Sequence, residues 1–277
     1  MDLTSRKNIK DLLKKHQLRP LKHFGQNFLI DKRALRKIVA AADLSSQDTV
    51  LEIGPGIGAL TQELAKKAGK VIAVEKDRNM VDILKETLKD FKNVQMVKGD
   101  ILKILNSKFI IHNSYKVVAN LPYYIVAPVI RKFLEMTEVR PQSMILMVQK
   151  EVAQRICAKP PHMSLLAVSV QFYATPEIIS YVSKKSFWPQ PKVDAAIIKI
   201  IPSVKLRLTE ESDLFFKIVK AGFSQPRKQL INNLSKALKI DREKTKTWLL
   251  KNKIQPTQRA ETLSIDDWLN LTKTFVV

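Results

Sequence analysis

Short apolar runs alternate with segments of helical periodicity along most of the chain up to about residue 200. The apolar runs are rich in Val and Ile and predict buried strands at 49–53, 71–75, 94–97, 115–119 and 143–148. Between them, apolar residues recur at helical spacing and predict helices at about 59–68, 78–89, 126–136 and 149–158. This alternation predicts an α/β fold with a mostly parallel sheet that is covered on both faces.

Two more apolar runs, 177–182 and 194–201, have no long helix between them. Strands that are joined without a crossover helix pair antiparallel, so we expect the last strand of the sheet to be antiparallel. Ahead of the first strand, apolar residues among lysines predict an amphipathic helix within 6–18. Asp31 precedes a second helical pattern, and we predict that it is the N-cap of that helix.

Beyond Pro202 the chain shows helical periodicity only. Ser264 and Asp267 have the spacing of a capping box ahead of the last helical pattern. We therefore predict two domains, a sheet domain at 1–203 and a small all-helical domain at 204–277.

Charge and composition narrow the possible partners. The chain carries 48 Lys and Arg against 26 Asp and Glu, a formal net charge of +22, which favours a polyanion partner over a merely solvated basic surface. Cys157 is the sole cysteine and the four histidines are scattered, so we expect no disulfide within the chain and no metal site. No apolar run reaches the length of a membrane span, and we expect a cytoplasmic protein.

Glycine is concentrated at one predicted turn. Three of the seven glycines, Gly54, Gly56 and Gly58, lie between a predicted strand and a predicted helix. Glycine permits positive φ and close approach of a ligand, and such turns bind nucleotides in α/β sheets. Glu75 ends the next strand, where a carboxylate can accept both hydrogen bonds of a ribose diol. The same pattern is compatible with NAD, or with a glycine turn that binds nothing.

Two features argue against NAD. Pro55 removes a backbone N–H at the position where a pyrophosphate needs donors. Asp100 follows the third strand and can accept a hydrogen bond from the amino group of an adenine, although it can equally cap the next helix. A hydride-transferring enzyme also typically has a histidine near the cleft, and no histidine lies in a candidate position.

The tetrapeptide after the fourth strand carries the most specific chemistry. Asn120 offers a side-chain carbonyl, and Pro122 favours an extended Leu121 whose backbone carbonyl points outward. Tyr123 adds an aromatic ring. Two acceptors beside a ring suit the exocyclic amine of a planar base. The alternative is an ordinary turn with a packed tyrosine.

Seven segments together resemble the rRNA adenine N6,N6-dimethyltransferase family. In chain order these are FGQNFL (24–29), LEIGPGIGALT (51–61), VIAVEKD (71–77), GDIL (99–102), NLPYYI (120–125), FWPQPKVDAA (187–196) and RAETLS (259–264). The full helical tail and the tyrosine-rich NLPYYI resemble the bacterial 16S rRNA branch more than the 23S rRNA enzymes. The resemblance implies a Rossmann-like class I methyltransferase sheet, mostly parallel with an antiparallel last strand, and a small C-terminal all-helical domain.

The resemblance also implies S-adenosyl-L-methionine as cofactor. Asn27 and Leu29 would contact its methionine end with Gln26 nearby, Glu75 would hold the ribose, and Asp100 would contact the adenine. The residues implied in cofactor binding are Gln26, Asn27, Leu29, Gly54, Gly56, Glu75, Asp100 and Asn120. The residues implied in catalysis are Asn120, Leu121, Pro122, Tyr123 and Phe187, with Tyr123 and Phe187 enclosing the target adenine.

The implied activity is transfer of methyl groups to N6 of adenosines in 16S rRNA, twice per base, at two adjacent adenosines near the 3′ end. Such an enzyme would be a monomer that acts in small-subunit biogenesis. Arg227, Lys228 and Lys236 would belong to its RNA-binding surface. A 23S rRNA adenine N6-methyltransferase and a non-catalytic rRNA or ribosome-assembly factor remain the alternatives.

Overall fold

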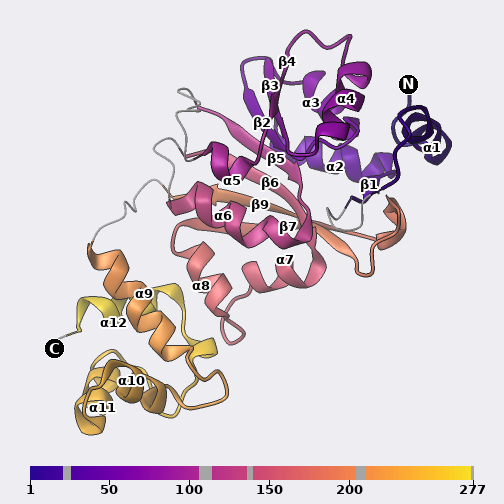
Figure 1. The fold of residues 1–277 in the computed structure, drawn as a ribbon. Coiled ribbons are helices and arrows are strands. Elements are labelled where there is room, and N and C mark those ends of the chain that lie inside the picture. Colours follow the sequence, from indigo (N-terminus) through magenta and orange to yellow (C-terminus); the bar gives the residue numbers. More distant parts are fainter. Residues whose placement is uncertain (21–25, 106–113, 136–139, 204–209, 276–277) are drawn as a thin grey trace. The chain divides into compact units, whose positions relative to one another are not determined.

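The computed structural model describes residues 1–20, 26–105, 114–135, 140–203 and 210–275 (Figure 1). The chain divides into two compact units. The sheet unit contains Met1–Ala153 and Pro176–Pro202, and the helical unit contains Gln154–Thr175 and Ser203–Val277. The helical unit thus includes a segment, 154–175, that precedes the last strands of the sheet in the sequence.

The sheet has seven strands within the described residues, in the order β4-β3-β2-β5-β6-β9-β7. The strands are β2 (Thr49–Ile53), β3 (Lys70–Glu75), β4 (Val94–Lys98), β5 (Lys116–Asn120), β6 (Ser143–Gln149), β7 (Ala174–Val182) and β9 (Ala195–Pro202). The pairs from β4 through to β6 are parallel, whereas β9 is antiparallel to β6. The predicted α/β fold, mostly parallel with an antiparallel strand near the end, is confirmed.

Helices connect the parallel strands, as the periodicity predicts, and further helices precede β2 and follow β6. They are α1 (Arg6–Lys15), α2 (Lys32–Ala42), α3 (Ala59–Ala65), α4 (Arg78–Thr87), α5 (Ile101–Ile104), α6 (Val126–Glu135) and α7 (Lys150–Ile156). The helices α3 and α7 are shorter than the predicted segments, and the single turn of α5 has too few residues for a periodic signal. Asp31 caps α2 by accepting the N–H groups of Arg33 and Ala34, as predicted.

Two apolar clusters hold this unit together. One joins α2 and α3 to the sheet, with Ile38, Leu64 and Val118 among its buried members. The other joins α1 to α4 through Ile9 and Ile83. Because α1 presents its apolar residues on one face, its lysines stay in solvent while that face is buried.

A short second ladder ties two distant segments of the chain. Strands β1 (Phe28–Leu29) and β8 (Phe187–Trp188) pair antiparallel, with Leu29 opposite Phe187. The N–H of Ile30 donates to the Ser186 carbonyl at 2.9 Å, which extends the ladder to η3 (Lys184–Ser186). The sequence analysis does not predict this pairing, because two-residue strands carry no periodicity.

The helical unit consists of α8 (Leu165–Gln171), α9 (Glu210–Gly222), α10 (Leu230–Leu238), α11 (Arg242–Lys251), η4 (Ala260–Thr262) and α12 (Ile265–Lys273). Trp268 of α12 is fully buried, and Phe172 stacks on Phe215 with ring centroids 4.2 Å apart. That contact places the end of α8 in the core of this unit. The capping box of Ser264 and Asp267 is confirmed. In the part of the chain that the structure describes, no helix is both long and apolar enough to span a membrane.

Candidate functional site

A cavity of about 390 Å³ opens at the carboxyl ends of the parallel strands in the sheet unit. The sheet order reverses between β2 and β5, which is the position where open α/β sheets bind their ligands. The cavity lining includes every residue that the family resemblance implies in cofactor binding: Gln26, Asn27, Leu29, Gly54, Gly56, Glu75, Asp100 and Asn120. Tertiary structure therefore brings these residues together from five separate segments of the chain.

The glycine turn after β2 has the backbone conformation that glycine permits. Gly54 has φ of 67° and Gly56 has φ of 59°, both in the left-handed region. A Cβ on Gly56 would also approach the ring of Phe28 at 3.7 Å. A side chain at either position would strain the turn, so the cavity keeps an exposed backbone wall here.

Glu75 at the end of β3 is held by backbone donors. Its Oε2 accepts the N–H of Gly56 at 3.1 Å and its Oε1 accepts the N–H of Asp77 at 2.8 Å. Burial raises the pKa of Glu75, although these hydrogen bonds oppose the shift. Each carboxyl oxygen keeps a further lone-pair site, so the group can still accept hydroxyl donors from the cavity.

Asp77 is a cavity residue that the sequence analysis did not single out. It caps α4 by accepting the N–H of Asn79 at 2.9 Å, and its other oxygen accepts Nε2 of Gln26 at 2.8 Å. Gln26 is therefore fixed against the wall of the cavity. The signal in the sequence was the acidic residue two positions after Glu75.

Asp100 performs the capping role that was the alternative for it, and it also faces the cavity. Its Oδ1 accepts the N–H of Leu102 at 3.0 Å, and its Oδ2 pairs with Lys76 Nζ at 3.0 Å. Burial acts to raise the pKa of Asp100, but the hydrogen bonds from Lys76 and Leu102 outweigh burial and lower it. An ionised carboxylate has about four acceptor sites, so capping does not exclude a ligand amino group.

Asn120 lies at the end of β5 with its amide oriented by the N-terminal segment. Nδ2 of Asn120 contacts the Asn27 carbonyl at 3.5 Å, a long hydrogen bond. Within the described residues, no donor engages the Asn120 Oδ1 or the Leu121 carbonyl. The next residue, Pro122, has φ of −56° and ψ of 133°, which is the extended conformation that precedes η2 (Tyr123–Ile125). Among the described residues, two acceptors of adjacent residues are therefore without a donor at one strand end.

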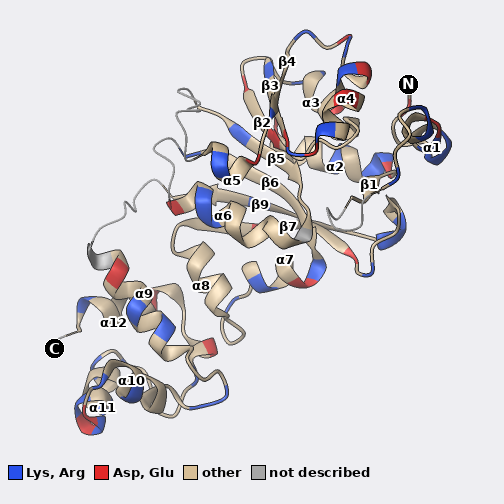
Figure 2. Ribbon diagram, in the orientation of Figure 1, with Lys and Arg blue, Asp and Glu red and all other residues tan. Residues whose placement is uncertain are grey.

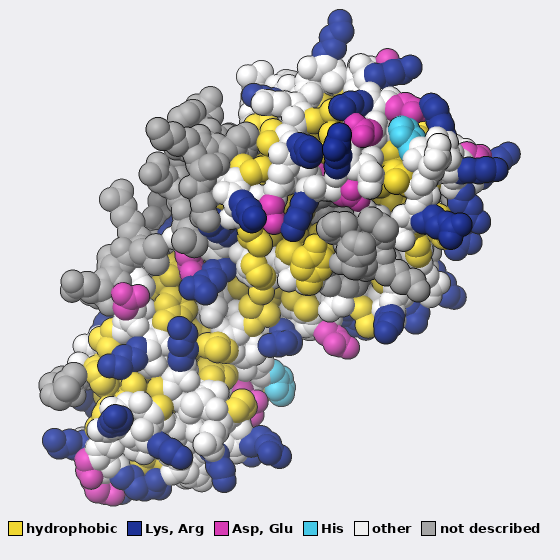
Figure 3. Space-filling view, in the orientation of Figure 1, with side chains coloured by type: hydrophobic (Ala, Val, Ile, Leu, Met, Phe, Trp, Pro, Cys, Tyr) yellow, Lys and Arg dark blue, Asp and Glu magenta, His cyan; other side chains and the backbone are white. Residues whose placement is uncertain are grey.

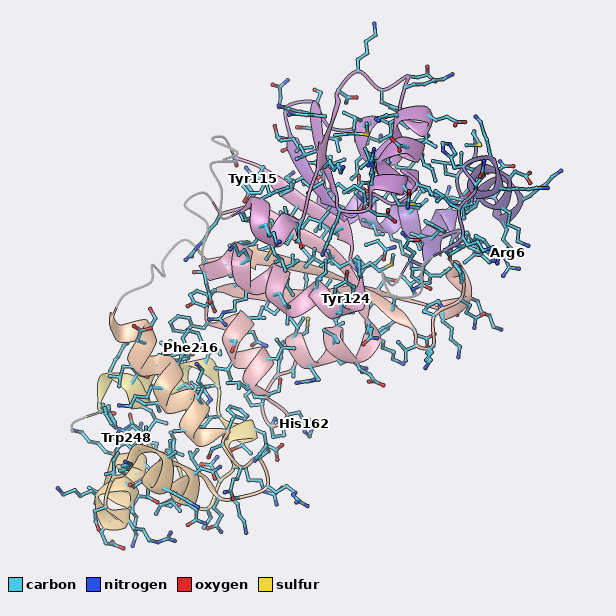
Figure 4. All side chains as sticks on the ribbon, viewed as in Figure 1. Arg6, Tyr115, Tyr124, His162, Phe216 and Trp248 are labelled. Carbon is cyan, nitrogen blue, oxygen red and sulfur yellow. The ribbon has the colours of Figure 1, made fainter. Side chains whose placement is uncertain are left out.

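Aromatic residues complete the cavity. Phe187 lines it, although packing against the core leaves its side chain only 2% exposed. Its partner in the β1–β8 ladder is Leu29, so that ladder joins two parts of the cavity wall. Tyr123 begins η2, and its side chain lies outside the described part of the structure. Tyr124 lines the cavity and is 57% exposed (Figure 4).

Glu52 is a buried acid beneath the glycine turn. It lines the cavity, is 1% exposed, and its Oε2 has no hydrogen-bond partner among the described residues. Burial raises the pKa of Glu52 to about 8, and the Glu75 carboxylate adds to the shift while Thr61 opposes it. The carboxyl is therefore mainly neutral at pH 7. A charged residue type inside an apolar strand is the sequence signal for such a group.

The basic residues Arg227, Lys228 and Lys236 lie on the helical unit and are exposed. Lys228 and Lys236 line one hollow of about 510 Å³ together with Asn232 of α10. Lys and Arg positions occur along the ribbon of both units (Figure 2), and their side chains are spread over the visible surface of both (Figure 3). The structure thus brings two of the three residues to one surface of the helical unit.

Comparison with known proteins gives one consistent family. The model of the family described as "Ribosomal RNA adenine dimethylase" matches residues 17–276. A Dehalococcoides mccartyi protein named "Ribosomal RNA small subunit methyltransferase A" is 45% identical over 264 residues, which cover 95% of this chain and 90% of the relative. A protein of the same name from Alkaliphilus metalliredigens is 42% identical and covers 98% and 97% of the two chains.

Solved structures of related enzymes also resemble this chain. A dimethyladenosine transferase from Plasmodium falciparum matches with a TM-score of 0.73 and 29% identity, covering 88% of this chain and 95% of the other. The 23S rRNA methyltransferase ErmE matches with a TM-score of 0.74 and 25% identity, covering 90% and 99%. These likenesses extend over both units of the fold. The chain therefore belongs to the ribosomal RNA adenine dimethylase family.

Proposed function

We propose that this protein transfers methyl groups from S-adenosyl-L-methionine to N6 of adenosines in 16S rRNA. The product is N6,N6-dimethyladenosine at two adjacent adenosines near the 3′ end, made during small-subunit biogenesis. The observation that carries the proposal is the pair of free acceptors at Asn120 and Leu121, which lie in the same cavity as Glu75 and Asp100. Family membership and the names of the relatives at 42–45% identity support it.

The cavity residues fit the proposed cofactor. A volume of about 390 Å³ suits a small molecule, since ligand pockets span roughly 300–1,000 Å³. Glu75 has acceptor sites for a ribose diol, and Asp100 has one for an adenine amino group. When bound, S-adenosyl-L-methionine supplies a methyl group activated by its sulfonium charge. The methionine end would contact Asn27 and Leu29.

The chain's own contribution to the reaction is alignment. The N6 lone pair of adenine is delocalised into the ring and is a weak nucleophile. Oδ1 of Asn120 and the Leu121 carbonyl oxygen accept hydrogen bonds from the two N–H groups of N6. These hydrogen bonds favour a more pyramidal and more reactive nitrogen. The bond from Nδ2 to Asn27 aims the Oδ1. Positioning and acceptors directed at developing positive charge lower the barrier, and the amine loses its proton after the attack.

The same acceptors explain release of the product. The dimethylated nitrogen has no N–H left, so Asn120 and Leu121 lose both hydrogen bonds to the base. The base has to leave its stack to reach the cavity, with Tyr123 and Phe187 as the rings beside it. We expect a cytoplasmic monomer that holds folded rRNA through basic side chains, among them Arg227, Lys228 and Lys236.

Methylation of 23S rRNA is the rival within the family. The 23S rRNA methyltransferase ErmE shares 25% identity with this chain, against 42–45% for the small-subunit relatives. A non-catalytic ribosome-assembly factor would have no need for the complete set of cavity residues. The sequence identities and the complete set of cavity residues therefore favour the small-subunit enzyme over these two alternatives.

One assay tests the proposed function. Radiolabelled S-adenosyl-L-methionine is incubated with the protein and unmethylated 30S subunits, 50S subunits, naked 16S rRNA or naked 23S rRNA. We expect label in the 30S reaction, recovered as dimethyladenosine after digestion. Label confined to 23S rRNA, or no label in any reaction, would contradict the proposal.

The Asn120→Ala variant tests the mechanism. We expect its rate of methyl transfer to fall by at least about 100-fold, because an acceptor aimed at the reacting nitrogen is lost. Binding of S-adenosyl-L-methionine, measured by calorimetry, should stay largely intact. Asn270→Ala, an exposed asparagine on α12, is the matched control. Wild-type turnover by Asn120→Ala would remove Asn120 from the mechanism.

A further inference from the structure

The strand β7 leaves one of its faces uncovered. It is at the edge of the sheet, next to β9. Ser180 accepts a hydrogen bond from Lys37 of α2 at 2.8 Å, so α2 reaches one face of the strand. The residues on the opposite face are exposed, and they include Ile179 at 39% and Tyr181 at 52%. Ile179 and Tyr181 are therefore two exposed apolar side chains side by side on one face of the strand.

One lysine lies over the exposed ring, and a second follows Tyr181 closely along the chain. Lys150 Nζ lies 5.5 Å from the centroid of the Tyr181 ring, in a cation–π arrangement. Asp194 holds the surrounding backbone: its carbonyl accepts the N–H of Lys150 at 3.0 Å, and its Oδ1 accepts the N–H of Lys184 at 3.0 Å. We refer to Tyr181, Lys150 and Lys184 as the Tyr181 cluster.

The two lysines of the Tyr181 cluster are not held in ion pairs by the described residues. The carboxylate of Asp194 is engaged by a backbone N–H instead. Lys and Arg positions are visible on the segment between β7 and β9 and at the start of α7 (Figure 2). Glu177 is on the same exposed face of β7, four residues before Tyr181.

The cluster lies at the same edge of the sheet as the cavity. Lys150 directly follows β6, and β6 pairs with β5 so that Met147 is opposite Asn120. The strands β5, β6, β9 and β7 are successive neighbours, so β7 lies three strand spacings, about 14 Å, from β5. Stacked nucleotides advance about 3.4 Å each, and that distance corresponds to a few nucleotides of RNA.

The connection to the cavity is also direct along the chain. The helix η3 begins at Lys184 and is followed at once by Phe187, which lines the cavity. Ser186 is anchored through its hydroxyl to Asp31 Oδ2 at 2.8 Å. An RNA strand that delivers a base to Asn120 would therefore pass a fixed aromatic and cationic surface.

We propose that the Tyr181 cluster binds a nucleotide of the substrate RNA outside the cavity, with Tyr181 stacking on the base and Lys150 and Lys184 contacting phosphate. The proposal rests on the proposed function. Aromatic side chains on single-stranded RNA surfaces stack on bases of any sequence, and lysines beside them neutralise the backbone. A protein partner would need a larger apolar surface than Ile179 and Tyr181 provide.

Four variants separate stacking from charge and from general apolar contact. Tyr181→Ala removes the ring, Tyr181→Phe keeps it, and Lys150→Met removes the charge while keeping the aliphatic stem. Ile179→Ala is the matched control, because it removes an exposed apolar side chain from the same face of the same strand. Each variant is checked by thermal unfolding and by its affinity for S-adenosyl-L-methionine, which we expect to be unchanged.

RNA binding is measured directly with 30S subunits and by the KM for RNA. We expect Tyr181→Ala to weaken RNA binding about 5- to 150-fold, because the stacking of one base is lost. The kcat at saturating RNA should be retained. Tyr181→Phe and Ile179→Ala should bind within about twofold of wild type, since both keep the ring. Lys150→Met should reduce the slope of log affinity against log salt by about 0.7 to 0.9.

Several outcomes would overturn the proposal. These are wild-type RNA affinity of Tyr181→Ala, equal losses for Ile179→Ala and Tyr181→Ala, or a loss for Tyr181→Phe as large as that for Tyr181→Ala. Crosslinking to 4-thiouridine-substituted RNA is a second measurement, and absence of Tyr181 from the crosslinked peptides counts against the proposal. Because the direct binding measurement with 30S subunits needs no turnover, failure of the methylation assay with intact RNA binding would contradict the proposed function and leave the Tyr181 cluster supported.

Discussion

At the scale of single residues, two neighbouring acids in the cavity have different hydrogen-bond surroundings. Glu52 and Glu75 are on adjacent parallel strands, and both are buried. Glu75 receives two backbone N–H donors, whereas Oε2 of Glu52 has no partner among the described residues. Hydrogen bonds to a carboxylate favour its charged form, and burial without them favours the neutral form. Glu52 therefore provides a neutral polar group beneath the glycine turn.

Glu52 predicts a dependence of stability on pH. Its pKa is raised to about 8 in the folded chain from an ordinary value of 4.5, so the folded state binds more protons between these values. The contribution of Glu52 is fully present below pH 4.5 and is lost as pH rises towards 8. Relative to Glu52→Gln, wild-type stability should fall by up to about 1.4 kcal/mol per pH unit in this window.

Urea unfolding of both proteins at intervals from pH 5 to pH 9 measures this difference. The two curves should converge towards low pH, and the difference between them should stop growing above pH 8. A constant difference at all pH values would mean that Glu52 does not remain neutral in the folded protein.

At the scale of elements, Asp31 links a helix to a strand of the cavity wall. Its Oδ1 caps α2, and its Oδ2 accepts the Ser186 hydroxyl at 2.8 Å, next to Phe187 in β8. The sequence predicts the cap, since Asp31 precedes an apolar helical pattern. The contact with Ser186 depends on a pairing between residues more than 150 positions apart, which no local pattern encodes.

We expect Asp31→Ala to destabilise the protein by about 1–3 kcal/mol, from the lost cap and the lost hydrogen bond. It should also weaken binding of S-adenosyl-L-methionine, because Leu29 and Phe187 line the cavity and pair in the ladder that Asp31 supports. Asp241→Ala is the control: Asp241 caps α11 in the helical unit, and its loss should cost about 0.5–2 kcal/mol without changing cofactor affinity. Equal cofactor affinity of both variants would show that Asp31 acts on α2 alone.

At the scale of the whole molecule, charge distinguishes this chain from a nucleotide-binding enzyme with a small substrate. A formal net charge of +22 favours a polyanion partner, and we expect binding to such a partner to be sensitive to salt. Exposed basic residues occur on both units, and Lys228 and Lys236 share one hollow of the helical unit. RNA binding by this unit remains a proposal that charge reversal tests.

Substitution of both Arg227 and Lys228 by Glu should weaken binding to 30S subunits. It should also reduce the slope of log affinity against log salt by about 1.4 to 1.8, because two phosphate contacts are lost. Binding of S-adenosyl-L-methionine should not change, since neither residue lines the cavity. The control is reversal of Lys89 and Lys92, two exposed lysines ahead of β4, at the opposite ends of the strands from the cavity. Equal effects of both double variants would indicate net charge rather than a defined RNA contact.

Much of the cavity was predictable because its parts are local. Parallel strands end at one edge, so residues that follow each strand, such as Glu75, Asp100 and Asn120, are brought together by topology alone. The capping box of Ser264 is equally local. In contrast, α8 was not predicted, and its aromatic neighbour Phe172 packs with the helical unit although the segment precedes β7 in sequence.

The sequence by itself determined the alternation of strands and helices, the glycine turn, the acceptors at strand ends and the strong positive charge. These depend on side-chain type and on spacing within a few residues, which local backbone geometry translates directly into structure. Only the tertiary structure decided that β1 pairs with β8, that Glu52 is neutral, and that Lys150 lies over Tyr181. Pairing, burial and cation–π contact depend on which distant segments meet, and that is a property of the packed chain.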